Sequence, residues 1–158
     1  MILSSLRDTR TIPFQIVGGA ELAIATRESH HKGVLRIYDV KSRGCGRHTS
    51  RVPLESYPNG VEAEVNDMAY SPCGRYIALG RQDNRTHIYD VRMMEQVNDK
   101  SSILYEFAHE DGRKRGTINP GQESFGICKV AWVREGEREG LVTAGSDGTL
   151  DQWSRFIS

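Results

Sequence analysis

A short phrase that recurs three times along the chain is the feature that most constrains its fold. The copies read VLRIYDV at Val34–Val40, THIYDV at Thr86–Val91 and DGTLDQW at Asp147–Trp153. Each copy is a short run of alternating apolar residues that ends in an aromatic residue, which is typical of a half-buried β-strand. Because self-similarity along a sequence dictates a whole architecture, the chain is expected to build one structural unit three times.

The spacing of the three phrases predicts the size of that unit. The aromatic residues Tyr38, Tyr89 and Trp153 lie 51 and 64 residues apart (89 − 38 and 153 − 89). A repeat of roughly 40–45 residues with insertions corresponds to a unit of four strands. The expected strands are Thr11–Val17, Leu22–Thr26, Val34–Val40, a weaker one within Arg47–Leu54, Val65–Tyr70, Tyr76–Gly80, Thr86–Val91, Ile103–Phe107, Cys128–Val133, Leu141–Ala144 and Thr149–Trp153.

Composition excludes several functional classes. The 21 basic and 21 acidic residues cancel, so no overall field favours a nucleic acid or an anionic membrane as partner. The longest apolar stretches are far too short to cross a bilayer, and the N-terminal residues lack the pattern of a secretory signal. Cys45, Cys73 and Cys128 are scattered and odd in number, which favours reduced thiols in an intracellular protein of the cytoplasm or nucleus.

Two longer segments resemble the WD40 repeat family. They read VNDMAYSPCGRYIALGRQDNRTHIYDV and CKVAWVREGEREGLVTAGSDGTLDQW, and Pro13–Val40 matches more loosely. The resemblance implies an all-β fold, an incomplete β-propeller of about three four-stranded antiparallel blades, the last of which lacks its fourth strand. The single domain 1–158 would divide into blades at about 11–54, 61–107 and 125–158, with loops at 41–60 and 110–124.

The resemblance also implies a structural hydrogen-bond relay in the third blade. By offset its members are His109, Thr143, Asp147 and Trp153. A buried indole N–H needs an acceptor and a buried carboxylate needs donors, so such a relay is physically reasonable. In the second blade Leu79 replaces the hydroxyl residue, and in the first blade Lys32 replaces the Asp. These two departures predict looser packing in the first two blades.

Three blades raise the problem of closure. Propellers hide their sheet faces by radial repetition, with typically four to eight blades in a ring. Three blades alone would leave two apolar faces exposed. The sequence therefore favours a piece of a larger propeller, and the alternative is assembly with another chain that completes the ring.

No motif for catalysis, metal or cofactor binding is evident. His30 and His31 could be imagined as metal ligands, but adjacent residues of a strand point to opposite faces and no further ligand lies at useful spacing. The segment Gly145–Gly148 lacks the spacing of a nucleophile elbow. A P-loop, a dinucleotide-binding glycine motif and a zinc-protease motif are all missing. We therefore expect no enzyme and no cofactor, and an enzyme that uses the mouth of a central channel is kept as a remote alternative.

The leading interpretation is a scaffold that binds other proteins through its loops. The candidate contact residues, chosen because they are expected to be exposed and because Arg is enriched at interfaces, are Arg75, Arg81, Arg85, Arg92, Arg113 and Arg115. An alternative comes from Tyr89–Arg92, which resembles the motif by which some WD40 proteins dock on the adaptor of a cullin-type ubiquitin ligase. There Arg92 and Lys41 would contact the adaptor.

Overall fold

The structure is a computed structural model, and the residues that it describes lie mostly in antiparallel strands. It describes residues 14–17, 21–28, 32–39, 48–54, 65–96, 103–109, 126–136 and 138–154. The strands form three sheets, and within each sheet neighbouring strands are consecutive in the chain. Every strand expected from the periodicity is present, with ends that match the expected ones or differ from them by a few residues.

Sheet one contains the first four strands in chain order. They are β1 (Phe14–Val17), β2 (Glu21–Glu28), β3 (Lys32–Asp39) and β4 (His48–Leu54). The fourth strand lies where a weaker strand was expected, within Arg47–Leu54, so the range 41–60 is not a loop throughout. A strand forms there because β4 satisfies the backbone groups along the edge of β3, which would otherwise stay unpaired.

Sheet two repeats this arrangement with β5 (Val65–Tyr70), β6 (Tyr76–Arg81), β7 (Arg85–Asp90) and β8 (Ile103–Ala108). Between its last two strands runs a short 3₁₀ helix, η2 (Val91–Gln96). The helix packs against β4 of sheet one. Met94 of η2 is fully buried there, so the connection itself helps to join the first two sheets.

Sheet three has three described strands, β9 (Ile127–Glu135), β10 (Arg138–Gly145) and β11 (Leu150–Ser154). Within the described ranges no strand pairs with the outer edge of β11, so the described part of this sheet has three strands where the other two have four. The three repeated aromatic residues take equivalent places, Tyr38 on β3, Tyr89 on β7 and Trp153 on β11. The prediction that they lie on the third strands of successive sheets is confirmed.

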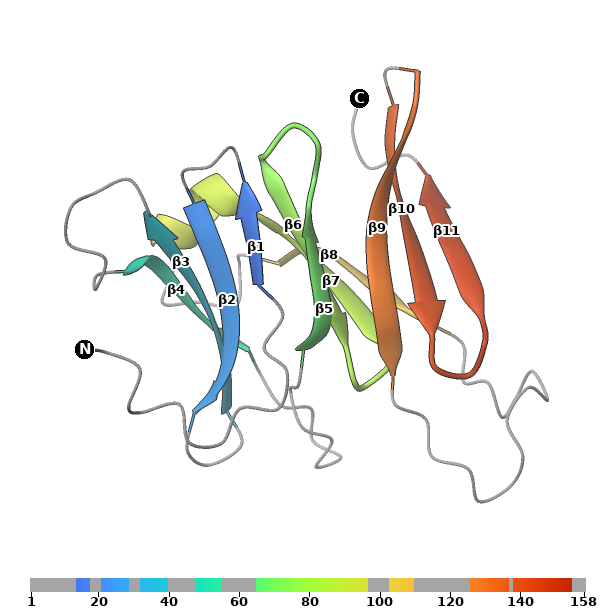
Figure 1. Ribbon diagram of the computed structural model, residues 1–158, viewed down its shortest axis with the longest axis horizontal. Helices are drawn as coiled ribbons and strands as arrows, with labels where there is room; N and C mark the ends of the chain where they lie inside the picture. The colour runs from blue at the N-terminus through green and yellow to red at the C-terminus, as the bar shows by residue number, and fades with distance from the viewer. Residues whose placement is uncertain are drawn as a thin grey trace.

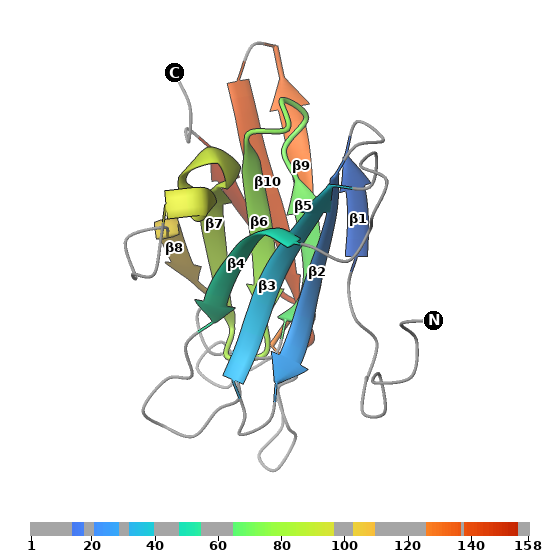
Figure 2. The same ribbon diagram turned by 90° about the vertical axis from the view of Figure 1, so that its left-hand side faces the viewer.

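The three sheets stand in a row, each packed face to face on the next (Figure 1). Turned by 90°, the molecule shows sheet one in front, with the strands of the other sheets behind it (Figure 2). The first strands β1, β5 and β9 lie side by side, as the inner strands of neighbouring propeller blades do. We call the side of a sheet that points to the following sheet its front face, and the opposite side its back face.

The hydrophobic core consists of two clusters, one at each junction between sheets. Ala23 and Ile37 on the front of sheet one meet Ile77, Leu79 and other residues on the back of sheet two. Ala78 and Ile88 on the front of sheet two meet sheet three, whose cluster members are Ile127, Val130, Trp132, Leu141 and Trp153. Each fully buried aliphatic side chain contributes roughly 1.5–3 kcal/mol of transfer free energy, so these junctions dominate stability.

The junction between sheets two and three is also joined by polar bonds. Trp132 donates its indole N–H to the Ala69 carbonyl over 2.9 Å, and Asp67 accepts the backbone N–H of Val130 over 2.9 Å. Gly80 permits this close approach, because a Cβ at that position would lie 2.7 Å from Cγ2 of Ile127. Small residues on front faces therefore receive the larger side chains of back faces.

Candidate functional site

A chain of hydrogen bonds runs through the junction between sheets two and three. The indole Nε1–H of Trp153 on β11 donates to Oγ1 of Thr143 on β10 over 3.0 Å. The Thr143 hydroxyl is hydrogen-bonded in turn to Nε2 of His109, the residue that follows β8. Thr143 and His109 are both buried, so water competes little for these groups.

The other nitrogen of the His109 ring extends the chain to a carboxylate. Its Nδ1 lies 3.2 Å from Thr149 Oγ1, and the Thr149 hydroxyl donates to Asp147 Oδ1 over 2.6 Å. The Asp151 carboxylate also lies 3.3 Å from Nδ1. If the ring is neutral with its hydrogen on Nδ1, every member donates to the next, from Trp153 to Asp147.

This arrangement ties the segment after sheet two to sheet three. The backbone N–H of His109 donates to the Asn84 carbonyl over 2.9 Å, which fixes the residue beside the β6–β7 turn. Burial opposes the ionisation of Asp147, but the hydrogen bonds from the Thr149 side chain and backbone outweigh it and hold the pKa of Asp147 below its ordinary value. The series of hydrogen bonds therefore ends at a charged acceptor, and hydrogen bonds to a charged group are stronger than those between neutral groups.

The structure brings together the four residues that the resemblance indicated and adds two others. Thr149 stands between His109 and Asp147, and Asp151 lies beside the ring. Thr149 follows Asp147 by two residues, and its backbone N–H bonds to that carboxylate over 3.0 Å. This is the spacing of an Asx-turn, a signal from which Thr149 could have been found in the sequence.

Sheet two holds a different group at the equivalent positions. The Arg81 guanidinium donates to both carboxylate oxygens of Asp83, over 3.2 Å from Nε and 2.9 Å from Nη2. The prediction that Arg81 is exposed and available to a partner is wrong, because its relative exposure is 0%. It lies on the same face of β6 as Ile77 and Leu79, and that face packs against sheet one.

His87 lies beside this ion pair. Its Nδ1 is 3.3 Å from the Tyr89 hydroxyl, and its Nε2 is 3.2 Å from a carboxylate oxygen of Glu106 on β8. Burial lowers the pKa of His87 to about 4, and the Arg81 guanidinium acts in the same direction. The imidazole is therefore neutral at physiological pH.

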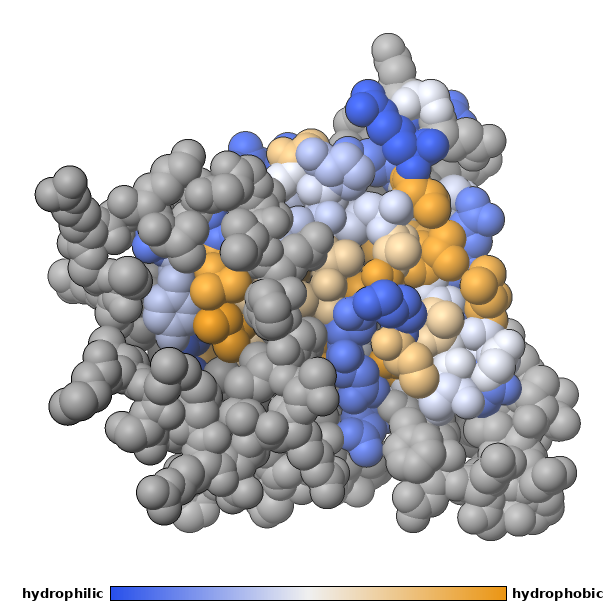
Figure 3. Space-filling view, in the orientation of Figure 1, coloured by the Kyte–Doolittle hydropathy of each residue, from blue (hydrophilic) through white to orange (hydrophobic). Residues whose placement is uncertain are grey.

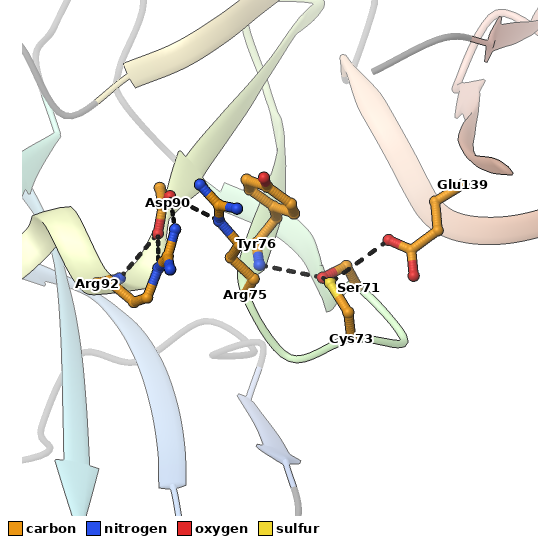
Figure 4. A network of polar contacts seen from close by, with 7 residues as sticks. All are labelled: Ser71, Cys73, Arg75, Tyr76, Asp90, Arg92 and Glu139. Carbon is orange, nitrogen blue, oxygen red and sulfur yellow. Dashed lines mark hydrogen bonds and ion pairs between the residues drawn. The ribbon is translucent and has the colours of Figure 1, made fainter. Parts of the chain in front are cut away.

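An accessible group of charged side chains lies at one rim of sheet two (Figure 4). Asp90, at the end of β7, accepts Nε and Nη2 of Arg92 over 3.2 and 3.1 Å and Nε of Arg75 over 3.0 Å. The side chain of Arg92 is 63% exposed and that of Arg75 46%, whereas Asp90 is buried. Burial opposes ionisation of Asp90, but the hydrogen bonds from Arg92 and Arg75 outweigh it and lower its pKa. One carboxylate thus orients two guanidinium groups and leaves one net positive charge.

A second set of contacts continues along this rim toward sheet three (Figure 4). Ser71 Oγ accepts the backbone N–H of Tyr76 over 3.0 Å and lies 3.2 Å from Cys73 Sγ. The Cys73 thiol in turn lies 3.6 Å from a carboxylate oxygen of Glu139. These contacts come from the turn before β6 and from β10, so the rim crosses the junction between the two sheets.

The remaining predicted residues divide into two groups. Arg85 is half-buried and pairs with Glu106 on the neighbouring strand, which leaves part of its guanidinium accessible. Arg113, Arg115 and Lys41 lie outside the described residues, as does the pair at 30–31.

In the part of the chain that the structure describes, no three His, Cys, Asp or Glu side chains are grouped to hold a metal ion. None of the described helices is long and apolar enough to span a membrane.

Comparison with known proteins identifies the fold. No protein-family model matches the chain. Over 97 residues, 61% of its length, it is 28% identical to "Probable cytosolic iron-sulfur protein assembly protein 1" from Candida glabrata. The match covers 25% of that relative, so the chain spans about a quarter of its length.

Two solved structures have the same architecture. The crystal structure of Raptor from Chaetomium thermophilum matches 96% of this chain and 12% of its own, with a TM-score of 0.62 and 15% identity. The Dos1 propeller matches 85% of this chain and 27% of its own, with a TM-score of 0.59 and 17% identity. The fold is an incomplete β-propeller. The all-β fold class predicted from the repeated phrase is thereby confirmed, and the likeness is to propellers of the WD40 type.

Proposed function

We propose that the chain is a non-enzymatic scaffold for protein–protein interaction, built from WD40-type repeats that form part of a larger propeller. The observation that carries the proposal is the rim at Asp90, where one buried carboxylate holds two accessible arginine side chains. Because the guanidinium groups are already oriented, less side-chain entropy is lost when a partner binds. The relative from Candida glabrata is described as an assembly protein, which agrees with such a role.

The rim favours an acidic protein segment as its ligand. Each guanidinium carries five N–H donors, and Asp90 uses one from Arg75 and two from Arg92, besides the backbone N–H of Arg92. The free donors can bind a carboxylate of a partner with charge-assisted hydrogen bonds. Met93, 48% exposed on η2, follows Arg92 in the chain and offers an adaptable apolar contact. Arg85, at the other end of β7, remains a candidate contact. Arg113 and Arg115, which lie outside the described residues, also remain candidates.

Quantitative affinity capture from cell extract tests this proposal. Partners should be recovered with the unmodified chain and with Arg134→Glu, an exposed charge change on β9 that serves as the matched control. The Arg75→Glu and Arg92→Glu changes should each reduce recovery of the same partners by about tenfold or more, because each reverses a contact charge. Equal recovery with all three variants would contradict the role of the rim.

A second candidate function is that of a substrate receptor for a cullin-type ubiquitin ligase. It is favoured by the placement of Arg92, which ends the Tyr89–Arg92 sequence. Two bonds to Asp90 hold its guanidinium, and its side chain is 63% exposed. Arg92→Ala should abolish co-purification with the ligase adaptor, whereas Arg75→Ala should preserve it. Unchanged recovery of the adaptor with Arg92→Ala would remove this candidate.

We also propose that the protein acts inside the cell. Cys73 and Cys128 are both exposed free thiols, which are typical of a reducing compartment. The relative from Candida glabrata is named as cytosolic. Fractionation of source cells with an antibody to the chain should recover it with cytoplasmic or nuclear markers, and recovery in the secreted fraction would contradict the assignment.

A further inference from the structure

The two arginine side chains at the rim beside Asp90 each keep one edge of the guanidinium open to a ligand. Arg92 donates its backbone N–H to Asp90 over 3.1 Å, and its Nε and Nη2 bond to both carboxylate oxygens. Arg75 donates only its Nε, while its guanidinium carbon lies 5.0 Å from the centre of the Tyr76 ring. Among the described residues, no hydrogen bond uses Nη1 of either group. The outer edge, formed by Nη1 and Nη2, can therefore donate to a ligand from both arginines.

Much of the positive charge of this rim is already compensated. Asp90 is ionised at neutral pH, because neighbouring guanidinium groups favour the charged form of a carboxyl, so the group of three carries one net positive charge. Glu139 adds another carboxylate further along the rim, 3.6 Å from the Cys73 thiol. Figure 3 shows mostly hydrophilic surface along the upper edge of the molecule, over the turn between β5 and β6. A ligand here therefore meets polar groups with little excess of positive charge.

The charge of a ligand decides how well it fits such a rim. The Asp90 carboxylate lowers the positive potential at the open edges, and a ligand with two negative charges loses about twice as much from this reduction as a ligand with one. Only 7% of the Asp90 side chain is exposed, so water screens the effect weakly. A phosphorylated side chain carries about 1.5 to 2 negative charges at neutral pH, whereas an aspartate or glutamate side chain carries a single one. A planar carboxylate can also accept an N–H from each nitrogen of an open edge, so charge and geometry both favour a carboxylate.

We propose that this rim selects the carboxylate of an aspartate or glutamate side chain of a partner protein over a phosphorylated side chain, and that Asp90 sets the preference. The inference rests on the proposed function, because it takes the rim as the contact site. Figure 4 shows Asp90 bonded to both arginine side chains, so the same carboxylate orients the donors and repels additional negative charge. A repulsive group placed within a binding site is a general means of rejecting a competing ligand.

Titration of the full chain with two peptides tests this preference. The peptides are blocked at both ends and contain glycines around either a single glutamate or a single phosphoserine. Binding is followed through the side-chain NMR signals of Arg75 and Arg92, which are assigned by substituting each arginine with lysine. We expect the glutamate peptide to have the lower dissociation constant, by about threefold or more. Tighter binding of the phosphoserine peptide, or signals that neither peptide shifts, would overturn the proposal.

Asp90→Asn separates a role in specificity from a purely structural one. The change keeps the size of the side chain and removes its charge, so weaker orientation affects both peptides, whereas the higher positive potential favours phosphoserine more. The ratio of the two dissociation constants should therefore shift toward phosphoserine by about tenfold. Asp67→Asn is the matched control, since Asp67 also binds a lysine and a backbone N–H. It pairs with Gly80 of β6, whereas Asp90 pairs with Tyr76 near the other end of that strand. The control should leave the ratio unchanged, and an equal shift in both variants, or in neither, would overturn the assignment of Asp90.

The first titration needs no variant of Asp90, so it decides the preference even if Asp90→Asn does not fold. It is also independent of the capture experiment on the proposed function. Loss of partners with Arg75→Glu and Arg92→Glu, together with tighter binding of the phosphoserine peptide, would overturn only the ligand chemistry and leave the contact site in place. Partners retained by both arginine variants, together with a preference for glutamate, would instead count against the role of the rim in partner binding.

Discussion

Sheets two and three bury different polar groups at equivalent positions. In sheet three, Thr143 and His109 belong to a chain of hydrogen bonds that begins at an indole N–H and ends at a carboxylate. At the equivalent place in sheet two, Leu79 carries no hydroxyl, and a fully buried Arg81 pairs with Asp83 instead. The fold therefore requires burial at this place but does not require one particular polar network.

The difference also changes how much stability is lost when one member of each polar network is removed. Removing the Thr143 hydroxyl from the relay takes a hydrogen-bond partner from an indole N–H and a ring nitrogen, while the Asp147 carboxylate keeps its bonds from Thr149. A buried ion pair loses its compensation, and the remaining charge stays in an apolar surrounding. The sequence predicted looser packing for sheet two because its relay is incomplete, and the structure instead fills the place with an ion pair. We therefore expect sheet two to be more sensitive to single substitutions.

The largest effect is expected for Arg81→Met. The change leaves the Asp83 carboxylate buried without its partner, which should lower the free energy of unfolding by about 3–5 kcal/mol. Urea denaturation followed by tryptophan fluorescence measures this value. Adding Asp83→Asn to the same chain removes the orphaned charge and should restore a large part of the loss. If Arg81→Met costs no more than a change at exposed Arg134, the pair does not stabilise the junction.

A smaller, pH-dependent effect is expected from His87 on the same side of sheet two. The unfolded chain takes up a proton on this histidine near the ordinary pKa of 6.5, whereas the folded chain does so only near 4. Between these values the unfolded state binds more protons, so lowering the pH favours unfolding. The free energy of unfolding should fall by about 3 kcal/mol from pH 6.5 to 4 because of this group.

His87→Gln isolates that contribution, since carboxylates titrate in the same range in both proteins. The difference in stability between the unmodified chain and the variant should shrink as the pH falls from 6.5 to 4. Urea midpoints measured at several pH values give the comparison. A difference that stays constant across this range would show that the folded chain protonates His87 as readily as the unfolded one.

The smallest of the three effects is expected in sheet three. Thr143→Val keeps the shape of the side chain but removes the hydroxyl that joins Trp153 to His109. Two buried polar groups lose a partner, which should cost about 1–3 kcal/mol. Thr143→Ser keeps the hydroxyl and is the matched control. A loss from Thr143→Val that exceeds the loss from Arg81→Met would reverse the order that the comparison predicts.

The architecture was accessible from the sequence because strand periodicity and the repeated aromatic phrase are local signals. Val65–Tyr70 was predicted with its observed ends, and the third strands were placed in all three sheets. The sequence signal for β4 is weak, because its segment is rich in residues typical of loops. The strand forms by pairing with the edge of β3. Pairing with a distant strand is a tertiary effect that local propensity does not contain.

The polar groups were predicted less completely, for a physical reason. Arg81 precedes a polar turn and was expected at the surface, although alternation places it on the same side as Ile77 and Leu79. What buries it is sheet one, packed against that side. The link from the turn residue Thr149 to Asp147 was overlooked. The resemblance assigns residues to positions by their offset in the sequence, and it does not say which groups bond to one another. Whether a long charged side chain is buried or exposed depends on packing across the junction, and the sequence of a single strand does not contain that information.

The account depends most on the sheets packing face to face in the order of the chain, and nuclear Overhauser contacts between assigned side chains test this directly. We expect contacts from the Trp153 ring to Phe107, whose ring centroids are 4.5 Å apart, and from the Trp132 indole N–H to β5, where it bonds to Ala69. Tryptophan contacts confined to β9, β10 and β11 would contradict the account, since sheet three would then not lie on sheet two.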